Sequence, residues 1–256
     1  VDFTGPMPDE TVSYTLADES GTYGNWNLIG NPYPSYLHMT DDSGEETNNF
    51  LTVNAAVIHD DYEAIYSWDG SDYVVYNNTT ESINHIAPGE AFFIYSVDGG
   101  GNAQFTEAMQ TSAQGQNFNA SIASGALLEQ KRVSIFKLEL KDNALDQTDI
   151  TKLYFSDEKE VSKGLDPGYD AGKFFAGSES RIFTRLVDED KGRDFHIQAL
   201  PLGDLNDVVI PLGITTKSST LELSVIENSL ENFYNVYLED NLNNTIVELD
   251  RSIKLE

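Results

Sequence analysis

Short apolar runs separated by turn-forming residues recur along the whole chain. Val12–Leu16 alternates apolar and polar positions with period two, as a half-buried β-strand does. Ala91–Tyr95 is almost continuously apolar, which is typical of a strand buried on both faces. Comparable runs occur at 64–68, 73–76, 132–140, 151–155, 181–186, 195–200, 208–213, 220–225 and 235–239. Their spacing, roughly 10–15 residues with turn signals between, predicts an all-β, antiparallel fold.

Two turns between these runs have a specific chemistry. Asp69-Gly70 separates the runs at 64–68 and 73–76, which predicts a β-hairpin. Pro88-Gly89 suits the central positions of a type II turn leading into the run that begins at Ala91. Helical signals are weak, with short helical turns predicted near 158–163 or 226–230.

The basic residues divide the chain into two parts. None of the 15 lysines and arginines lies in residues 1–130, and residues 110–127 form a linker-like stretch rich in Ser, Ala, Gly, Asn and Gln. We therefore predict two β-sandwich or jelly-roll-like domains. The first spans residues 1–125 and the second spans residues 126–256.

The overall charge excludes several classes of partner. With 43 acidic residues against 15 basic ones, the net charge is −28. Such a field repels nucleic acid and anionic membranes, so we expect neither as a partner. The chain has no cysteine, which excludes disulfides, thiol catalysis and cysteine-type zinc sites. No apolar run approaches the ~18 residues that a membrane-spanning helix needs.

Several motifs occur in an order that matches a known group of proteins. Residues 26–35 read Trp-Asn-Leu-Ile-Gly-Asn-Pro-Tyr-Pro-Ser, and further motifs follow at 64–70, 86–93, 168–175, 198–201, 210–213 and 236–240. The set resembles the region carrying a GWNLVGNPYPS-type motif in large secreted Bacteroidetes proteins, which are typically exported by the type IX secretion system. The resemblance implies a secreted, cell-surface protein. It implies no particular reaction, because such regions accompany adhesins, proteases and polysaccharide-degrading enzymes alike. Val1 in place of Met predicts a segment of a longer polypeptide.

Aromatic side chains are the candidates for ligand binding, because their faces suit the C–H groups of a sugar ring. Three belong to the 26–36 segment and three to the predicted hairpin. The candidates are Trp26, Tyr33, Tyr36, Tyr66, Trp68 and Tyr73. Asparagine amides beside Trp26 are available to bond sugar hydroxyls. The alternative is that these side chains are core residues and that residues 31–34 form a rigid turn.

One acidic loop has carboxylate spacing that resembles the start of a calcium-binding loop. Its candidate ligands are Asp188, Asp190 and Asp194. Gly192 stands where the next ligand is expected, and the closing glutamate is absent. The alternative is an ordinary loop of an acidic protein. Calcium is therefore a candidate cofactor, and no other cofactor is indicated.

No catalytic motif is apparent in the sequence. The four histidines are scattered without metal-ligand spacing, and no Gly-x-Ser-x-Gly element supplies a nucleophile. A chain with 43 acidic residues contains many pairs of carboxylates, so such pairs do not by themselves indicate glycoside hydrolysis. We predict a non-catalytic adhesion or spacer module of a secreted cell-surface protein that binds polysaccharide. The alternatives are a fragment of a polysaccharide-degrading enzyme and a structural domain that docks a neighbouring domain of the same polypeptide.

Overall fold

The computed structural model describes most of the chain, which divides into two compact units. The described residues are 8, 10–19, 21, 23–41, 46–69, 73–79, 85–112, 133–174, 177–231, 234–249 and the backbone of 253–255. Unit 1 comprises Val1–Leu128 and Pro167–Ala171, and unit 2 comprises Glu129–Asp166 and Gly172–Glu256. The predicted boundary near residue 125 lies outside the described residues.

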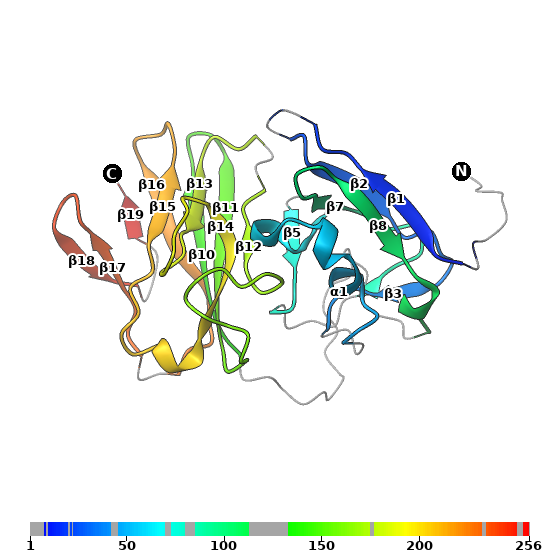
Figure 1. Cartoon of the computed structure of the whole chain (residues 1–256). Coiled ribbons are helices and arrows are strands. Elements are labelled where there is room, and N and C mark those ends of the chain that lie inside the picture. The colour runs from blue at the N-terminus through cyan, green and yellow to red at the C-terminus, as the bar shows by residue number, and fades with distance from the viewer. Residues whose placement is uncertain are drawn as a thin grey trace. The chain divides into compact units, whose positions relative to one another are not determined.

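Unit 1 contains a four-stranded antiparallel sheet with the strand order β2-β7-β4-β5 (Figure 1). Its strands are β2 (Trp26–Gly30), β4 (Ile65–Trp68), β5 (Tyr73–Tyr76) and β7 (Ala91–Tyr95). Strands β4 and β5 pair directly, which confirms the predicted hairpin, although its turn residues 70–72 lie outside the described residues. The predicted type II turn before β7 is confirmed by a φ of 71° at Gly89 and by the Glu90 amide, which donates to the Ala87 carbonyl at 3.1 Å.

Smaller elements complete unit 1. Strand β1 (Val12–Leu16) pairs with β8 (Gly101–Phe105), and β3 (Tyr36–His38) pairs with β6 (His85–Ile86) and β9 (Gln110–Thr111). The helical elements are α1 (Phe50–Asn54) and the 3₁₀ turns η2 (Ala55–Val57), η3 (Asp60–Tyr62) and η4 (Glu107–Met109). The hydrophobic pattern did not predict α1, because five residues are too few to display helical periodicity.

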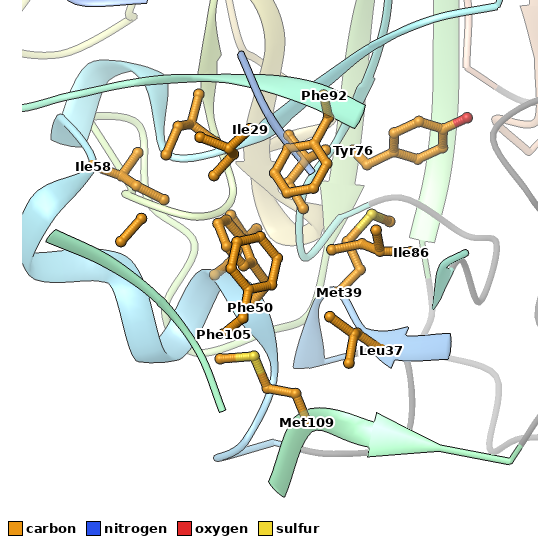
Figure 2. Packing of buried hydrophobic residues seen from close by; sticks show 14 of the residues in the cluster. Ile29, Leu37, Met39, Phe50, Ile58, Tyr76, Ile86, Phe92, Phe105 and Met109 are labelled. Carbon is orange, nitrogen blue, oxygen red and sulfur yellow. The ribbon is translucent and has the colours of Figure 1, made fainter. Parts of the chain in front are cut away.

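The inner face of the four-stranded sheet packs on α1 and the smaller sheets. Phe50 of α1 lies at the centre, with its ring 5.1 Å from that of Phe92 and 5.0 Å from that of Phe105. Figure 2 shows Ile29 and Phe92 on one side of this centre and Leu37 and Met109 on the other. Side chains alternate between the two faces of a strand. Ile29 and Phe92 point into the core, so the residues next to them on β2 and β7 point to the outer face of the sheet.

Unit 2 is built on a larger sheet with the strand order β15-β13-β14-β11-β10-β16-β19, and β12 pairs with β14 (Figure 1). The strands are β10 (Val133–Asp142), β11 (Gln147–Ser156), β12 (Ala171–Gly172), β13 (Arg181–Thr184), β14 (Phe195–Pro201), β15 (Leu212–Thr215), β16 (Leu221–Asn228) and β19 (Ile253–Leu255). Strands β11 and β14 run parallel, whereas β10 is antiparallel to both β11 and β16. The 3₁₀ turn η5 (Leu202–Asp204) follows β14, and β17 (Tyr237–Asp240) and β18 (Thr245–Glu248) form a separate hairpin.

The structure confirms the predicted all-β, antiparallel class and corrects a few local expectations. No helix forms at 158–163 or 226–230: the Val161 amide donates to the Glu158 carbonyl in a single turn, and β16 extends through residue 228. Among the described residues, the structure contains no helix long and apolar enough to cross a bilayer.

Two hairpins of unit 2 are closed by the same turn chemistry. Asp142 accepts from the backbone amides of Ala144 and Leu145, and Asp240 accepts in the same way from Leu242 and Asn243. The last turn residue of each hairpin has a left-handed backbone, with φ of 52° at Asp146 and at Asn244. The carboxylates of these Asp-Asn sequences therefore close turns.

The five residues Pro167–Ala171 belong to unit 1, far from its other residues in the sequence. The Asn78 amide donates to the Gly168 carbonyl at 2.8 Å, and the Asn77 side chain donates to the Tyr169 carbonyl at 2.7 Å. Gly168 has a φ of 79°, and a β-carbon there would lie 3.1 Å from Asn78 Nδ2. The positive φ and this close approach therefore favour glycine at this position.

Candidate functional site

The motif at residues 26–35 is mainly structural. The Asn31 side chain is buried and donates to the carbonyls of Ser35, Ile86 and Ala87 at 2.8–3.1 Å, while its oxygen accepts from the Tyr33 amide. Tyr33 is 2% exposed, and its hydroxyl donates to the Phe105 carbonyl at 2.7 Å. These bonds join segments that are distant in the sequence, so the motif holds unit 1 together.

The side chains of the asparagines beside Trp26 also make hydrogen bonds within the protein. Asn25 donates to the Ser96 carbonyl at 3.2 Å, and Asn27 both donates to and accepts from the backbone of Ala17. Their amide groups bond to backbone, as polar groups at strand ends commonly do. The polar groups expected to bind sugar hydroxyls therefore stabilise the fold instead.

The six candidate aromatic residues do not form one site. Tyr33 and Tyr66 are 2% and 0% exposed, so burial removes both from the possible ligand contacts. Tyr36 is half-buried on β3, which belongs to a different sheet from the hairpin aromatics. The three that remain, Trp26, Trp68 and Tyr73, all lie on the outer face of the four-stranded sheet.

One part of this outer face is a packed aromatic cluster. The Trp26 ring meets the rings of Tyr62, Tyr66 and Tyr95 edge to face, at centroid distances of 5.7, 4.7 and 5.0 Å. Tyr62 lies on η3 and also contacts Tyr95 at 4.4 Å. Because these rings pack edge to face against one another, Trp26 mainly stabilises the sheet.

The other part of the outer face is open to solvent, and we call it the aromatic platform. It consists of Leu28, Trp68, Tyr73, Ala91 and Phe93. Leu28 is 61% exposed and Trp68 is 50% exposed. The Trp68 ring lies 5.0 Å from that of Tyr73, which lies 6.0 Å from that of Phe93. Side chains from four adjacent strands therefore form one apolar surface.

Sequence reasoning identified part of this platform and missed the rest. Trp68 and Tyr73 were candidates because they flank the hairpin turn. Leu28 and Phe93 were not, because both belong to apolar runs that read as core. The signal for Leu28 is the alternation in β2, where Ile29 is buried and Leu28 must point to the opposite face.

Unit 1 also contains an unusual carboxyl group that the sequence did not indicate. Glu63 is 9% exposed, and burial raises its pKa to about 7, with a smaller contribution from the charge of Asp60. Its Oε1 atom faces Gly168, where a β-carbon would lie 3.3 Å away. We see no hydrogen bond to this carboxyl among the described residues. A carboxyl group that stays protonated near neutral pH is able to donate a proton.

The predicted calcium loop is organised around basic side chains. Asp194 lies 2.7 Å from the Arg185 guanidinium, Asp190 lies 4.0 Å from it, and Asp188 pairs with Lys163 at 3.8 Å. Asp190 also accepts from the Gly192 amide. The described part of the chain contains no group of three or more histidine, aspartate or glutamate side chains placed to hold a metal ion.

A cluster of buried polar side chains lies in unit 2. Lys173 is 5% exposed, and its ammonium group lies 2.6 Å from Asp149 and donates to the Ile150 carbonyl. His196 Nδ1 lies 3.3 Å from the same ammonium group, and burial, together with Lys173 and Lys152, lowers the pKa of His196 well below its usual value. The imidazole is therefore neutral, and Asp149 and the Ile150 carbonyl compensate the buried charge of Lys173.

Comparison with known proteins identifies a family but does not indicate an activity. Residues 2–253 match the sequence model of a family described as a domain of unknown function. No curated protein and no solved structure matches the chain.

Proposed function

The chain belongs to the DUF8693 family, a domain of unknown function, and we propose that it is a non-catalytic adhesion module that binds polysaccharide through the aromatic platform of unit 1. The observation that carries this proposal is the exposure of Trp68 and Leu28 on a face shared by four strands. A large exposed apolar surface in a strongly acidic protein marks an interaction site.

The chemistry of the platform suits a sugar polymer. The half-exposed indole of Trp68 offers an aromatic face on which the apolar side of a pyranose ring stacks. Tyr73 extends the aromatic surface onto β5, where its ring lies 5.0 Å from that of Trp68. Leu28 and Phe93 extend the apolar surface across the neighbouring strands, so that one face accommodates successive sugar units.

The resemblance of residues 26–35 to secreted Bacteroidetes proteins supports a location outside the cell. An extracellular module with an apolar platform would attach a longer polypeptide to a surface polysaccharide. Docking of a neighbouring domain is the competing use of the same platform, because aromatic side chains also anchor protein interfaces. Binding of isolated polysaccharides separates the two.

The experiment is affinity gel electrophoresis of the full chain in gels containing soluble neutral polysaccharides. We expect at least one polysaccharide to retard the protein, and we expect Trp68→Ala to weaken its binding about tenfold or more, which corresponds to about 1.4 kcal/mol. Tyr237→Ala is the matched control, because Tyr237 is 56% exposed on unit 2 and lies outside the platform.

Circular dichroism of each variant establishes that the fold is intact. Trp68→Ala is expected to fold, because the side chain is half exposed and outside the core of unit 1. Retardation that both variants retain equally would contradict a role for the platform. If no polysaccharide retards the protein, the proposal of glycan binding fails as a whole.

A further inference from the structure

The charge of unit 1 is unusual in its distribution as well as in its size. Residues 1–128 and 167–171 contain nineteen aspartates and glutamates and no lysine or arginine. Unit 2 holds all 15 basic residues of the chain. The unit that carries the aromatic platform therefore has no basic side chain of its own to offset its negative field.

Carboxylates lie at one end of the platform. Asp69 directly follows Trp68 at the end of β4, and Glu90 directly precedes Ala91 at the start of β7. Burial raises the pKa of the core residue Tyr76 to about 12, and the charges of Glu90 and Asp69 contribute to this increase. Because β4 and β7 run antiparallel, the end of β4 and the start of β7 lie at the same end of the four-stranded sheet. Glu90 is held there because its Oε2 atom accepts from the Ala87 amide at 2.8 Å.

We infer that the ligand of the aromatic platform is a cationic polymer of amino sugars, whose rings stack on Trp68 and whose ammonium groups lie in the negative field around Asp69 and Glu90. This inference rests on the function proposed above and adds the charge of the ligand. The electrostatic field of unit 1 repels an anionic polysaccharide and adds no attraction for a neutral one, whereas it concentrates a cationic one at the surface. An ammonium group close to an exposed indole face also gains a cation–π interaction.

The test compares two oligomers of equal length, one of β-1,4-linked glucosamine and one of its N-acetylated counterpart. Binding to the full chain is measured by calorimetry at mildly acidic pH, where the amine is protonated. We expect the glucosamine oligomer to bind about tenfold more tightly than the acetylated one. Raising the salt concentration from about 0.05 M to about 0.5 M is expected to remove most of this preference, because the screening length becomes shorter than the platform.

Two pairs of variants assign the effect to the platform. Trp68→Ala is expected to weaken binding of both oligomers, and Tyr237→Ala is expected to weaken neither. Asp69→Asn is expected to weaken binding of the glucosamine oligomer alone. Asp207→Asn is its control, because it removes one charge from an exposed position of unit 2.

The outcomes distinguish this inference from the proposed function. Equal binding of the two oligomers, lost in Trp68→Ala, would overturn the inference and leave the proposed function standing. Competition by polylysine that is unaffected by Trp68→Ala would indicate general adsorption of polycations and would also overturn it. Failure of both these oligomers to bind, together with retardation by a neutral polysaccharide, would overturn the inference alone. Failure of every polysaccharide would overturn both.

Discussion

Glu63 is predicted to make the stability of unit 1 depend on pH in an unusual direction. Its pKa rises from an ordinary value of 4.5 to about 7 in the folded protein, mainly because the carboxyl is buried. Between these two values the folded state holds a proton that the unfolded state has released. The free energy of unfolding therefore falls as pH rises through this range, and the full loss is present above pH 7.

The size of the effect follows from the shift. A change of one unit in pKa corresponds to about 1.4 kcal/mol, so the ionised carboxyl destabilises unit 1 by about 3 kcal/mol at pH 8. Glu63→Gln removes the ionisation while preserving the shape of the side chain. We expect the variant and the natural protein to have similar stability at pH 4, and the variant to be about 3 kcal/mol more stable at pH 8.

The assay is urea unfolding followed by tryptophan fluorescence. Both tryptophans, Trp26 and Trp68, belong to unit 1, so the signal reports on this unit without interference from unit 2. Glu107→Gln is the control for removing one negative charge, because Glu107 is an exposed residue of the same unit. Its substitution is expected to change stability by under about 0.5 kcal/mol.

The comparison between variants cancels the general effect of pH on a highly acidic chain. A difference between Glu63→Gln and the natural protein that is the same at pH 4 and pH 8 would refute the reasoning. It would mean that the Glu63 carboxyl is hydrated in the folded protein and ionises normally. A difference of the opposite sign at pH 8 would show that the charged form is bound by a partner group.

Three further substitutions test the architecture. Asn31→Ala is expected to destabilise unit 1 by about 2–3 kcal/mol in the fluorescence assay, because several buried backbone groups lose their partner. Gly24→Ala is expected to lower the melting temperature of unit 1, since a β-carbon would lie 1.6 Å from the Glu19 carbonyl oxygen. An unchanged melting temperature would show that this loop rearranges freely. Lys173→Met is expected to destabilise unit 2 by about 3–5 kcal/mol in far-ultraviolet circular dichroism, because Asp149 is left with a poorly compensated charge.

The sequence predicted local β-structure well and long-range packing poorly. The β4–β5 hairpin and the turn at Pro88-Gly89 follow from local turn chemistry, and both are present. The burial of Tyr33 was not predictable, because it depends on the Phe105 carbonyl, which is distant in the sequence. Glu63 gave no signal for a similar reason, since nothing in a run of acidic residues distinguishes the one that packing encloses.

The acidic loop of unit 2 shows the same limit for charge patterns. The spacing of Asp188, Asp190 and Asp194 is compatible with a cation, and the sequence alone does not show which cation. Arg185 contributes its guanidinium from a neighbouring position of the loop, within 4.0 Å of two of these carboxylates. The guanidinium offsets the charge of these carboxylates, so their spacing alone does not identify a metal site.

The inclusion of residues 167–171 in unit 1 determines when its last segment is synthesised. Asn77 and its acceptor at Tyr169 are 92 positions apart, so unit 1 remains incomplete after its first 128 residues have been synthesised. The β10–β11 hairpin of unit 2 is translated before this last segment of unit 1. The two units are therefore interleaved in the gene, and a recombination event between them would leave unit 1 without its final segment.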